Sequence, residues 1–339
     1  MEAPHAESSW TDVRRRVRQS RAAWWCLVFL AACALVSAAA PLLPLPSPVT
    51  LQLQAEPRGP TAPWVELGNH GFTPEYWHLG AIDGALVRLR QSAFGDWQTS
   101  SWLGTDSKGR DLLSRIVWGS RTSILTALLA TLTSLVVGVA YGAVAGFAGG
   151  RVDNWMMRLV DVLYSVPFIF LVIFLITIVS AWRNELEERF GIDRETVFYV
   201  VIGAVYWLTM ARVVRGQVLA LRKREFVDAA RVLGASTTRI VLVHVLPNVL
   251  SIAIVYLTLT IPAVMLFEAF LSFLGLGIEP PKVSWGLLAV DGTDAINPIR
   301  IYWWLVVWPA AAMASVLLAL NVLGDGLRDA LDPKLRGVE

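Results

Sequence analysis

Six long apolar runs dominate the pattern of hydrophobic and polar positions along the chain. Each is long enough to cross a hydrocarbon core of about 30 Å as an α-helix. The runs cover residues 22–43, 122–148, 158–181, 196–216, 246–276 and 301–323. The pattern therefore predicts an all-α polytopic membrane protein with six transmembrane helices.

The first run has competing interpretations. A cytoplasmic N-terminal segment, 1–21, is polar and basic, and Trp24 and Trp25 stand at the entry to the run, where amphipathic rings favour the interface. Residues 37–39 would also suit a cleaved signal peptide, and residues 30–33 resemble a lipoprotein box. Because the run stays apolar past both positions, we expect a retained first transmembrane helix, 22–43.

The segments between the runs set the predicted domain boundaries. Prolines crowd the start of an extracytoplasmic loop, which with an interfacial helix covers 44–118 and contains a short helix at 83–94. A charged hairpin or short helix is expected at 183–196. A membrane-spanning domain is placed at 119–324, with a C-terminal cytoplasmic tail at 325–339.

The second run carries a stripe of small residues at every fourth position. Its members are Ala130, Ser134, Gly138, Gly142 and Gly146. Small residues in this register let another helix approach closely, so the stripe predicts a buried packing face.

A polar stretch inside the hydrophobic C-terminal part has a pattern of its own, at residues 225–247. Four apolar residues fall on one predicted helix face: Phe226, Ala229, Ala230 and Leu233. Gly234 follows where a helix end favours positive φ, and Ser236 is a candidate cap for a second helix that runs on until Leu246-Pro247. A helix, a glycine break and a second helix between spans predict a docking element.

Composition and charge agree with a membrane protein and orient it. The chain has 339 residues, is 55% hydrophobic and 17% charged, and its net charge of +2 gives no reason to expect a nucleic-acid partner. With the N-terminus inside, the inner segments hold 17 Lys and Arg residues and the outer segments 12. Residues 212–240 contribute most to this bias, so both termini and the docking element are predicted to be cytoplasmic.

The sequence lacks recognisable catalytic and metal-binding patterns. Cys26 and Cys33 share a helix face and cannot bridge each other, and the four histidines have no metal-ligand spacing. There is no glycine-rich phosphate loop, HExxH motif or Ser-His-Asp grouping. We therefore expect a non-enzyme without a metal or cofactor of its own, and any ATPase must be another chain.

The polar stretch and its neighbours carry a family resemblance. Asp228-Ala229-Ala230, then Gly234, then Leu246-Pro247 resembles the EAA loop of bacterial ATP-binding-cassette (ABC) importer permeases, with Asp228 where the pattern usually has Glu. Further motifs resemble the second-permease type of the dipeptide/oligopeptide/nickel branch, over roughly 103–333. They are the segments 103–123, SFLGLGIEPP at 272–281, SWG at 284–286 and LGDGLRDALDP at 323–333.

The resemblance implies a fold, partners and functional residues. The fold would be the MetI-like type I importer fold, in the bacterial inner membrane. Partners would be a second permease subunit, two ABC ATPase subunits that bind ATP and Mg, and an extracytoplasmic substrate-binding protein. The cytoplasmic coupling loop, 217–247, would dock on an ATPase through Glu225, Phe226, Asp228, Ala229, Ala230, Gly234, Leu246 and Pro247.

Charged residues in and near the spans are further candidates. Glu268 lies within a span, and it either lines the path or binds a neighbouring helix, the latter being favoured. Asp161 is expected to pair locally with Arg158. An outer-face motif either receives the binding protein or anchors an interfacial helix by snorkelling and pairing; it comprises Asp106, Gly109, Arg110, Asp111, Arg115 and Arg121.

The predicted function is that of a permease subunit of an ATP-driven importer for di- or oligopeptides, working by alternating access. Two rivals are an ATPase-independent secondary transporter and a non-transporting membrane scaffold. The absence of obvious inverted repeats counts against the first rival. Substrate identity, the roles of 44–102 and 183–196, and the identity of the second permease chain stay open.

Overall fold

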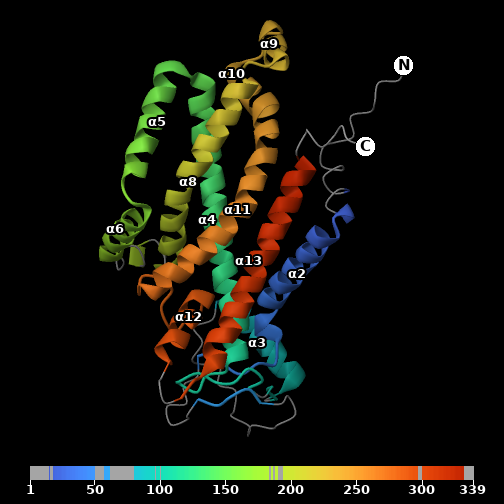
Figure 1. Cartoon of the computed structure of the whole chain (residues 1–339), viewed down its shortest axis with the longest axis vertical. Coiled ribbons are helices and arrows are strands. Elements are labelled where there is room, and N and C mark those ends of the chain that lie inside the picture. Colours follow the sequence, from blue (N-terminus) through green and yellow to red (C-terminus); the bar gives the residue numbers. More distant parts are fainter. Residues whose placement is uncertain are drawn as a thin grey trace. The chain divides into compact units, whose positions relative to one another are not determined.

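The computed structural model describes residues 15, 18–49, 57–61, 80–95, 97–99, 101–182, 185, 188, 189, 194–296 and 300–331, and within these ranges it contains helices and no strand (Figure 1). The predicted all-α fold is confirmed. Most of the charged insert at 183–196 and much of the 44–102 loop lie outside the described residues.

Five of the described helices are long and apolar enough to cross a membrane. They are α2 (Arg21–Ala38), α4 (Leu112–Ala148), α8 (Arg194–Leu221), the continuous stretch ending in α11 (Leu246–Phe273), and α13 (Trp303–Leu331). A bent pair, α5 (Gly150–Ser165) and α6 (Phe168–Ala181), makes a sixth candidate span. Shorter elements are η1 (Ala40–Leu42), α3 (Ala81–Phe94), α9 (Glu225–Val232), α10 (Thr237–Arg239), η3 (Ile240–Val245) and α12 (Trp285–Asp294).

The third span was predicted as one helix over 158–181, and this is wrong. The chain forms two helices that meet at an angle of 91°. Val166, which precedes Pro167, is extended at φ −81° and ψ 128°. A proline ring excludes the α region for the residue before it, so the helix ends there and a new one starts after Pro167.

The chain divides into two compact units. Unit 1 contains Met1–Cys26, Ala127–Val264 and Leu320–Glu339, and unit 2 contains Leu27–Thr126 and Met265–Ala319. Helices α2, α4, α11 and α13 each contribute residues to both units.

Unit 1 is held together by very close packing of α4 against α8. A Cβ on Gly142 would lie 2.5 Å from the Ala211 carbonyl oxygen, and one on Gly146 would lie 2.8 Å from the Arg215 carbonyl oxygen. Ala130 and Ser134, in the same register, are also buried. Any side chain larger than hydrogen at the glycines would force the two backbones apart.

Unit 2 is built around the first turns of α4. This helix begins at Leu112, so its start lies within the predicted 44–118 segment, and the residues directly before it, 101–111, form turns and no helix. The predicted short helix at 83–94 is present as α3. At the other end of the chain, α13 continues to Leu331, so the first part of the predicted 325–339 tail is helical.

Candidate functional site

The polar stretch after α8 forms the helix α9 in unit 1. Its first turn contains Glu225 and Asp228, and its last turn contains Arg231. Acidic side chains near a helix N-terminus and a basic one near the C-terminus both interact favourably with the helix dipole and stabilise the helix. Local sequence therefore supports an eight-residue helix whose N-cap, Arg224, supplies no side-chain hydrogen bond.

The end of α9 is a hydrogen-bonded stop. The Gly234 amide donates to the Arg231 carbonyl at 2.9 Å, and the Ala235 amide donates to the Ala230 carbonyl at 3.0 Å. This is the Schellman arrangement, and Gly234 has the φ of +80° that it requires. A Cβ on Gly234 would meet nothing within 4 Å, so the backbone angle and not lack of space is what favours glycine.

The second half of the loop starts at Ser236, whose hydroxyl accepts a hydrogen bond from the Arg239 amide at 3.4 Å. The predicted end of this helix at Leu246-Pro247 is wrong. The chain runs through α10 and the π-helical turn η3 directly into α11. A proline lacks the N–H that an α-helix would pair, and the wider turn just before Pro247 accommodates that loss.

One face of α9 is fixed to the core of unit 1. Val227 is fully buried and Ala230 nearly so, and they join a cluster with residues of α4, α8 and η3. The apolar face predicted from the sequence is mostly not the face that packs on the core. Of its four residues only Ala230 is buried, and Phe226, Ala229 and Leu233 are exposed.

The opposite side of the loop presents apolar side chains outward. Val232 is 88% exposed and Leu233 86%, and Phe226 is 40% exposed. Beside them Asp228 forms an exposed ion pair with Arg231 at 2.8 Å. Contiguous apolar side chains rimmed by charge are typical of a protein-binding surface. We refer to Phe226, Asp228, Val232 and Leu233 as the docking face.

The loop is also tied to the α4–α5 turn. Arg222 donates a hydrogen bond to the Phe147 carbonyl at 2.8 Å, and the Arg231 guanidinium lies 5.9 Å from the centre of the Phe147 ring. Figure 1 shows α9 at the same end of α8 as α10 and the start of α11. The arrangement offers no catalytic group; what it provides is a short helix held rigidly on a transmembrane core.

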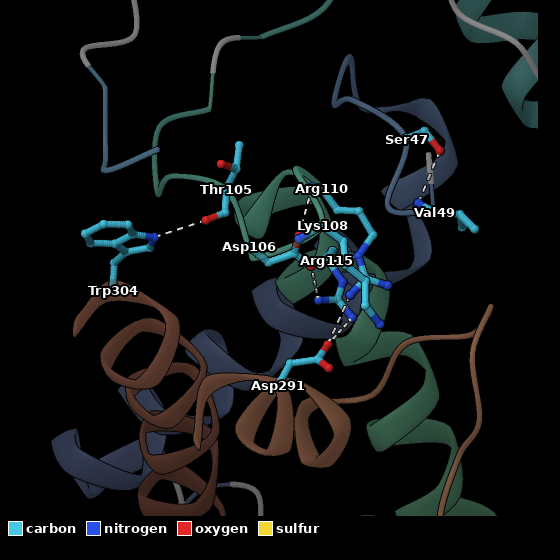
Figure 2. Close-up of polar contacts among 9 residues, drawn as sticks. All are labelled: Ser47, Val49, Thr105, Asp106, Lys108, Arg110, Arg115, Asp291 and Trp304. Carbon is cyan, nitrogen blue, oxygen red and sulfur yellow. Dashed lines mark hydrogen bonds and ion pairs between the residues drawn. The ribbon is translucent and has the colours of Figure 1, made fainter. Parts of the chain in front are cut away.

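In unit 2, the predicted outer-face motif forms a buried charge network (Figure 2). The Asp106 carboxylate accepts hydrogen bonds from Nε of Arg110 and Nη1 of Arg115, each at 2.7 Å. Both guanidinium groups also contact the Asp291 carboxylate on α12, at 3.2 and 2.8 Å. The network joins the 104–111 turn, the start of α4 and α12. Gly109, at φ +76°, makes that turn.

Asp111 caps α4 next to this network. Its carboxylate accepts a hydrogen bond from the Ser114 amide at 2.7 Å, the N3 position of a helix N-cap. Burial raises the pKa of Asp111 from its ordinary 3.8 to about 6, against the opposing effect of hydrogen bonds from Ser114 and Ser101.

These positions correct the snorkelling interpretation. Arg115 is 1% exposed and Arg110 7%, so neither side chain reaches an interface. Arg121 binds both oxygens of Asp83 on α3, at 2.8 and 3.0 Å, and lies over the Trp118 ring. The arginines of the motif therefore pair inside unit 2.

Glu268 on α11 is 1% exposed and belongs to a serine-lined contact. It accepts hydrogen bonds from Ser272 at 3.0 Å and from Ser123 on α4 at 3.2 Å. Ser123 in turn accepts from the Trp285 amide at the start of α12. This geometry supports the helix-binding role for Glu268.

Asp161 pairs with Arg212 of α8 at 2.7 Å, in an exposed position, and the expected partner Arg158 is wrong. A bidentate contact between Asp153 and Arg215 also joins α5 to α8. Sequence reasoning missed Asp153, Asp291 and Ser123 as partners. Each pairs across more than sixty residues of chain, and no local pattern signals such a contact. No cluster that could hold a metal ion occurs among the residues with described positions.

Comparison with protein families matches residues 138–337 to the family described as "Binding-protein-dependent transport system inner membrane component". Residues 8–57 match a second family, the N-terminal TM domain of oligopeptide transport permease C. The resemblance thus extends N-terminally beyond the predicted limit of residue 103.

Relatives cover most of the chain. The oligopeptide transport system permease protein OppC of Escherichia coli (strain K12) is 40% identical over 97% of this chain and 92% of its own length. The dipeptide transport system permease protein DppC of Bacillus subtilis (strain 168) is 44% identical over 69% of each chain.

A solved chain of the MetNI methionine ABC transporter, in an inward-facing conformation, has a similar fold. The TM-score is 0.50 at 17% identity, covering 65% of this chain and 98% of that chain. The predicted MetI-like fold and the predicted family are both confirmed. This chain belongs to the family of binding-protein-dependent transport system inner membrane components.

Proposed function

We propose that this chain is a transmembrane permease subunit of an ATP-driven, binding-protein-dependent importer of di- or oligopeptides. It would work with a second permease subunit, two ABC ATPases and an extracytoplasmic binding protein, and move substrate by alternating access. The peptide class is supported by what the relatives are named for. The chain itself would hydrolyse nothing, and ATP and Mg would bind to the ATPases.

The observation that carries the proposal is the docking face on α9. Two buried side chains, Val227 and Ala230, attach α9 to the core of unit 1. The apolar side chains on the other side of α9 are exposed. A helix attached in this way transmits a push or pull from a bound partner to α4 and α8 without bending. The proposed occupant is an ATPase on the cytoplasmic side, which the Lys and Arg bias of 212–240 also favours.

Two roles proposed from sequence are refined here. The docking face, Phe226, Asp228, Val232 and Leu233, would touch the ATPase. The other coupling residues would shape and support the loop: Glu225, Ala229, Leu246 and Pro247. Glu268 would hold α4, α11 and α12 together and not line the path.

Co-purification tests the proposal. The four transporter chains and the binding protein are expressed together, and this chain is captured in mild detergent. We expect both ATPases at stoichiometric yield, and a large loss of them with Leu233→Glu, which places a charge in the docking face. Thr238→Glu, an exposed change in the same loop, is the matched control and keeps them bound. Undiminished ATPase capture by Leu233→Glu would contradict the proposed docking face.

A further inference from the structure

Helix α3 in unit 2 has its polarity reversed relative to a helix on a water-facing surface. Its outward side carries Ile82, 78% exposed, and Leu89, 58% exposed, with the exposed Ala85 and Ala93. At 100° per residue these four positions fall within an arc of about 80°. They form one aliphatic stripe, which we call the outer stripe of α3.

The inward side of the same helix carries two of its three charged residues, Asp83 and Arg90. Arg90 is 3% exposed, and Asp83 binds Arg121 of α4 through both carboxylate oxygens. Burying charges while exposing isoleucine and leucine is unfavourable in water, where the opposite arrangement would lower the free energy. It is favourable where the outward surroundings are apolar.

The neighbours of α3 place it beside membrane-spanning helices. It packs against η1, which directly follows α2, and the last turn of α2 exposes Leu35 at 70% and Val36 at 43%. Its partner Arg121 lies in the third turn of α4, and that helix of 37 residues is about 55 Å long, roughly 25 Å more than the hydrocarbon core. The contact between Asp83 and Arg121 is therefore compatible with a position of α3 at the membrane–water interface.

Aromatic and basic side chains complete the pattern. Trp97 is 58% exposed and Trp102 41%, and tryptophan is enriched at membrane interfaces. Arg88 is exposed at the margin of the outer stripe, where its guanidinium can reach a lipid phosphate.

We propose that α3 is an interfacial helix whose outer stripe lies among the lipid acyl chains. Such a helix would be buried about 5–10 Å into the boundary between headgroups and acyl chains. It would fix the depth of the first turns of α4 in the membrane, because Asp83 holds Arg121.

Fluorescence quenching in the assembled transporter tests this proposal. Cysteines at Ile82 and Leu89, in a Cys26→Ser, Cys33→Ser background, are labelled with a nitrobenzoxadiazole dye, and the complex is placed in phosphatidylcholine nanodiscs. Leu35→Cys serves as the lipid-facing reference and Lys108→Cys as the polar reference. All four positions are exposed or partly exposed, so labelling leaves the core intact.

We expect nitroxide-labelled phosphatidylcholine to quench the dye at positions 82 and 89 to the extent seen at 35, and iodide in the buffer to quench it at 108 only. Quenching by iodide and not by nitroxide lipid at 82 and 89 would overturn the proposal. Protection from both quenchers would also overturn it, because a protein would then cover the stripe. Loss of that protection when the binding protein is omitted would identify the binding protein as the occupant.

Discussion

Replacing Asp106 with asparagine should be the most damaging single change in unit 2. One oxygen of its carboxylate accepts from the Lys108 and Arg110 amides at 2.8 and 2.9 Å. The other accepts from the Arg110 and Arg115 guanidinium groups at 2.7 Å each. Asparagine keeps the first pair of hydrogen bonds, but it turns an amide N–H group toward two buried cations.

The magnitude follows from burial. Asp106 is 2% exposed and Arg115 1%, so the loss is that of a buried pair with one partner removed, about 3–5 kcal/mol. Asp291 still contacts both guanidinium groups, which places the expected loss near the lower limit, about 3 kcal/mol.

Denaturant unfolding of the purified chain in detergent measures this loss. Asp291→Asn should cost less than Asp106→Asn, since that carboxylate is 26% exposed and keeps some hydration. Asp294→Asn, an exposed change on the same helix, should stay within about 0.5 kcal/mol of the parent. If Asp106→Asn also stays within about 0.5 kcal/mol, the network does not hold unit 2 together.

Three further changes have definite expected outcomes. Because the pKa of Asp111 is raised to about 6, the folded protein favours the neutral acid, so the free energy of unfolding should fall by roughly 3 kcal/mol as pH rises from about 4 to about 6. Asp111→Asn is still a good N-cap and should flatten this pH dependence when unfolding is measured across the range. An unchanged slope would contradict the assignment. Gly142→Ala should destabilise the α4–α8 contact by about 1–3 kcal/mol. The control is Gly216→Ala on α8, where a Cβ would meet nothing within 4 Å, and it should be neutral or stabilising. Equal effects of the two changes on unfolding would refute the close-packing argument. Glu268→Gln keeps an acceptor for one serine, and its NH2 group can donate to the other hydroxyl, so peptide uptake in proteoliposomes should stay near the parental rate. A large loss of uptake with normal assembly would favour a path-lining role.

The spans could be predicted because a bilayer requires long apolar runs, and each run can be recognised from consecutive residues of the sequence. The break at Pro167 was also readable, since a proline stood inside the predicted third span. It was missed because hydropathy averaged over a window does not register one residue's backbone restriction.

In the candidate site, too, the features that depend on local sequence could be predicted and those that depend on packing could not. Gly234 and Ser236 could be placed from sequence because a helix stop and a cap need only local geometry. The face of α9 could not, because periodicity groups Phe226, Ala229, Ala230 and Leu233 without telling which side the core occupies. The core lies on the Val227 side, and that depends on α4 and α8.

The charge network shows the limit of sequence reasoning most clearly. Arg110 and Arg115 were recognised as a motif, but their partner Asp291 is 181 residues from Arg110. Without it, surface pairing and snorkelling were the natural interpretations. The exposure of Val232 and Leu233 could not be predicted from the sequence either, and the proposed docking face depends on it.

The central claim is that α9 carries force from an ATPase into the transmembrane core, and Gly234 tests it most directly. The measurement is peptide taken up per ATP hydrolysed in proteoliposomes that contain the complete transporter and its binding protein. A β-branched residue at φ +80° is strained by about 1–3 kcal/mol, whereas asparagine tolerates this region. We predict that Gly234→Val lowers uptake per ATP severalfold while the ATPases stay bound, and that Gly234→Asn keeps most of it. Parental uptake per ATP in Gly234→Val would contradict the account.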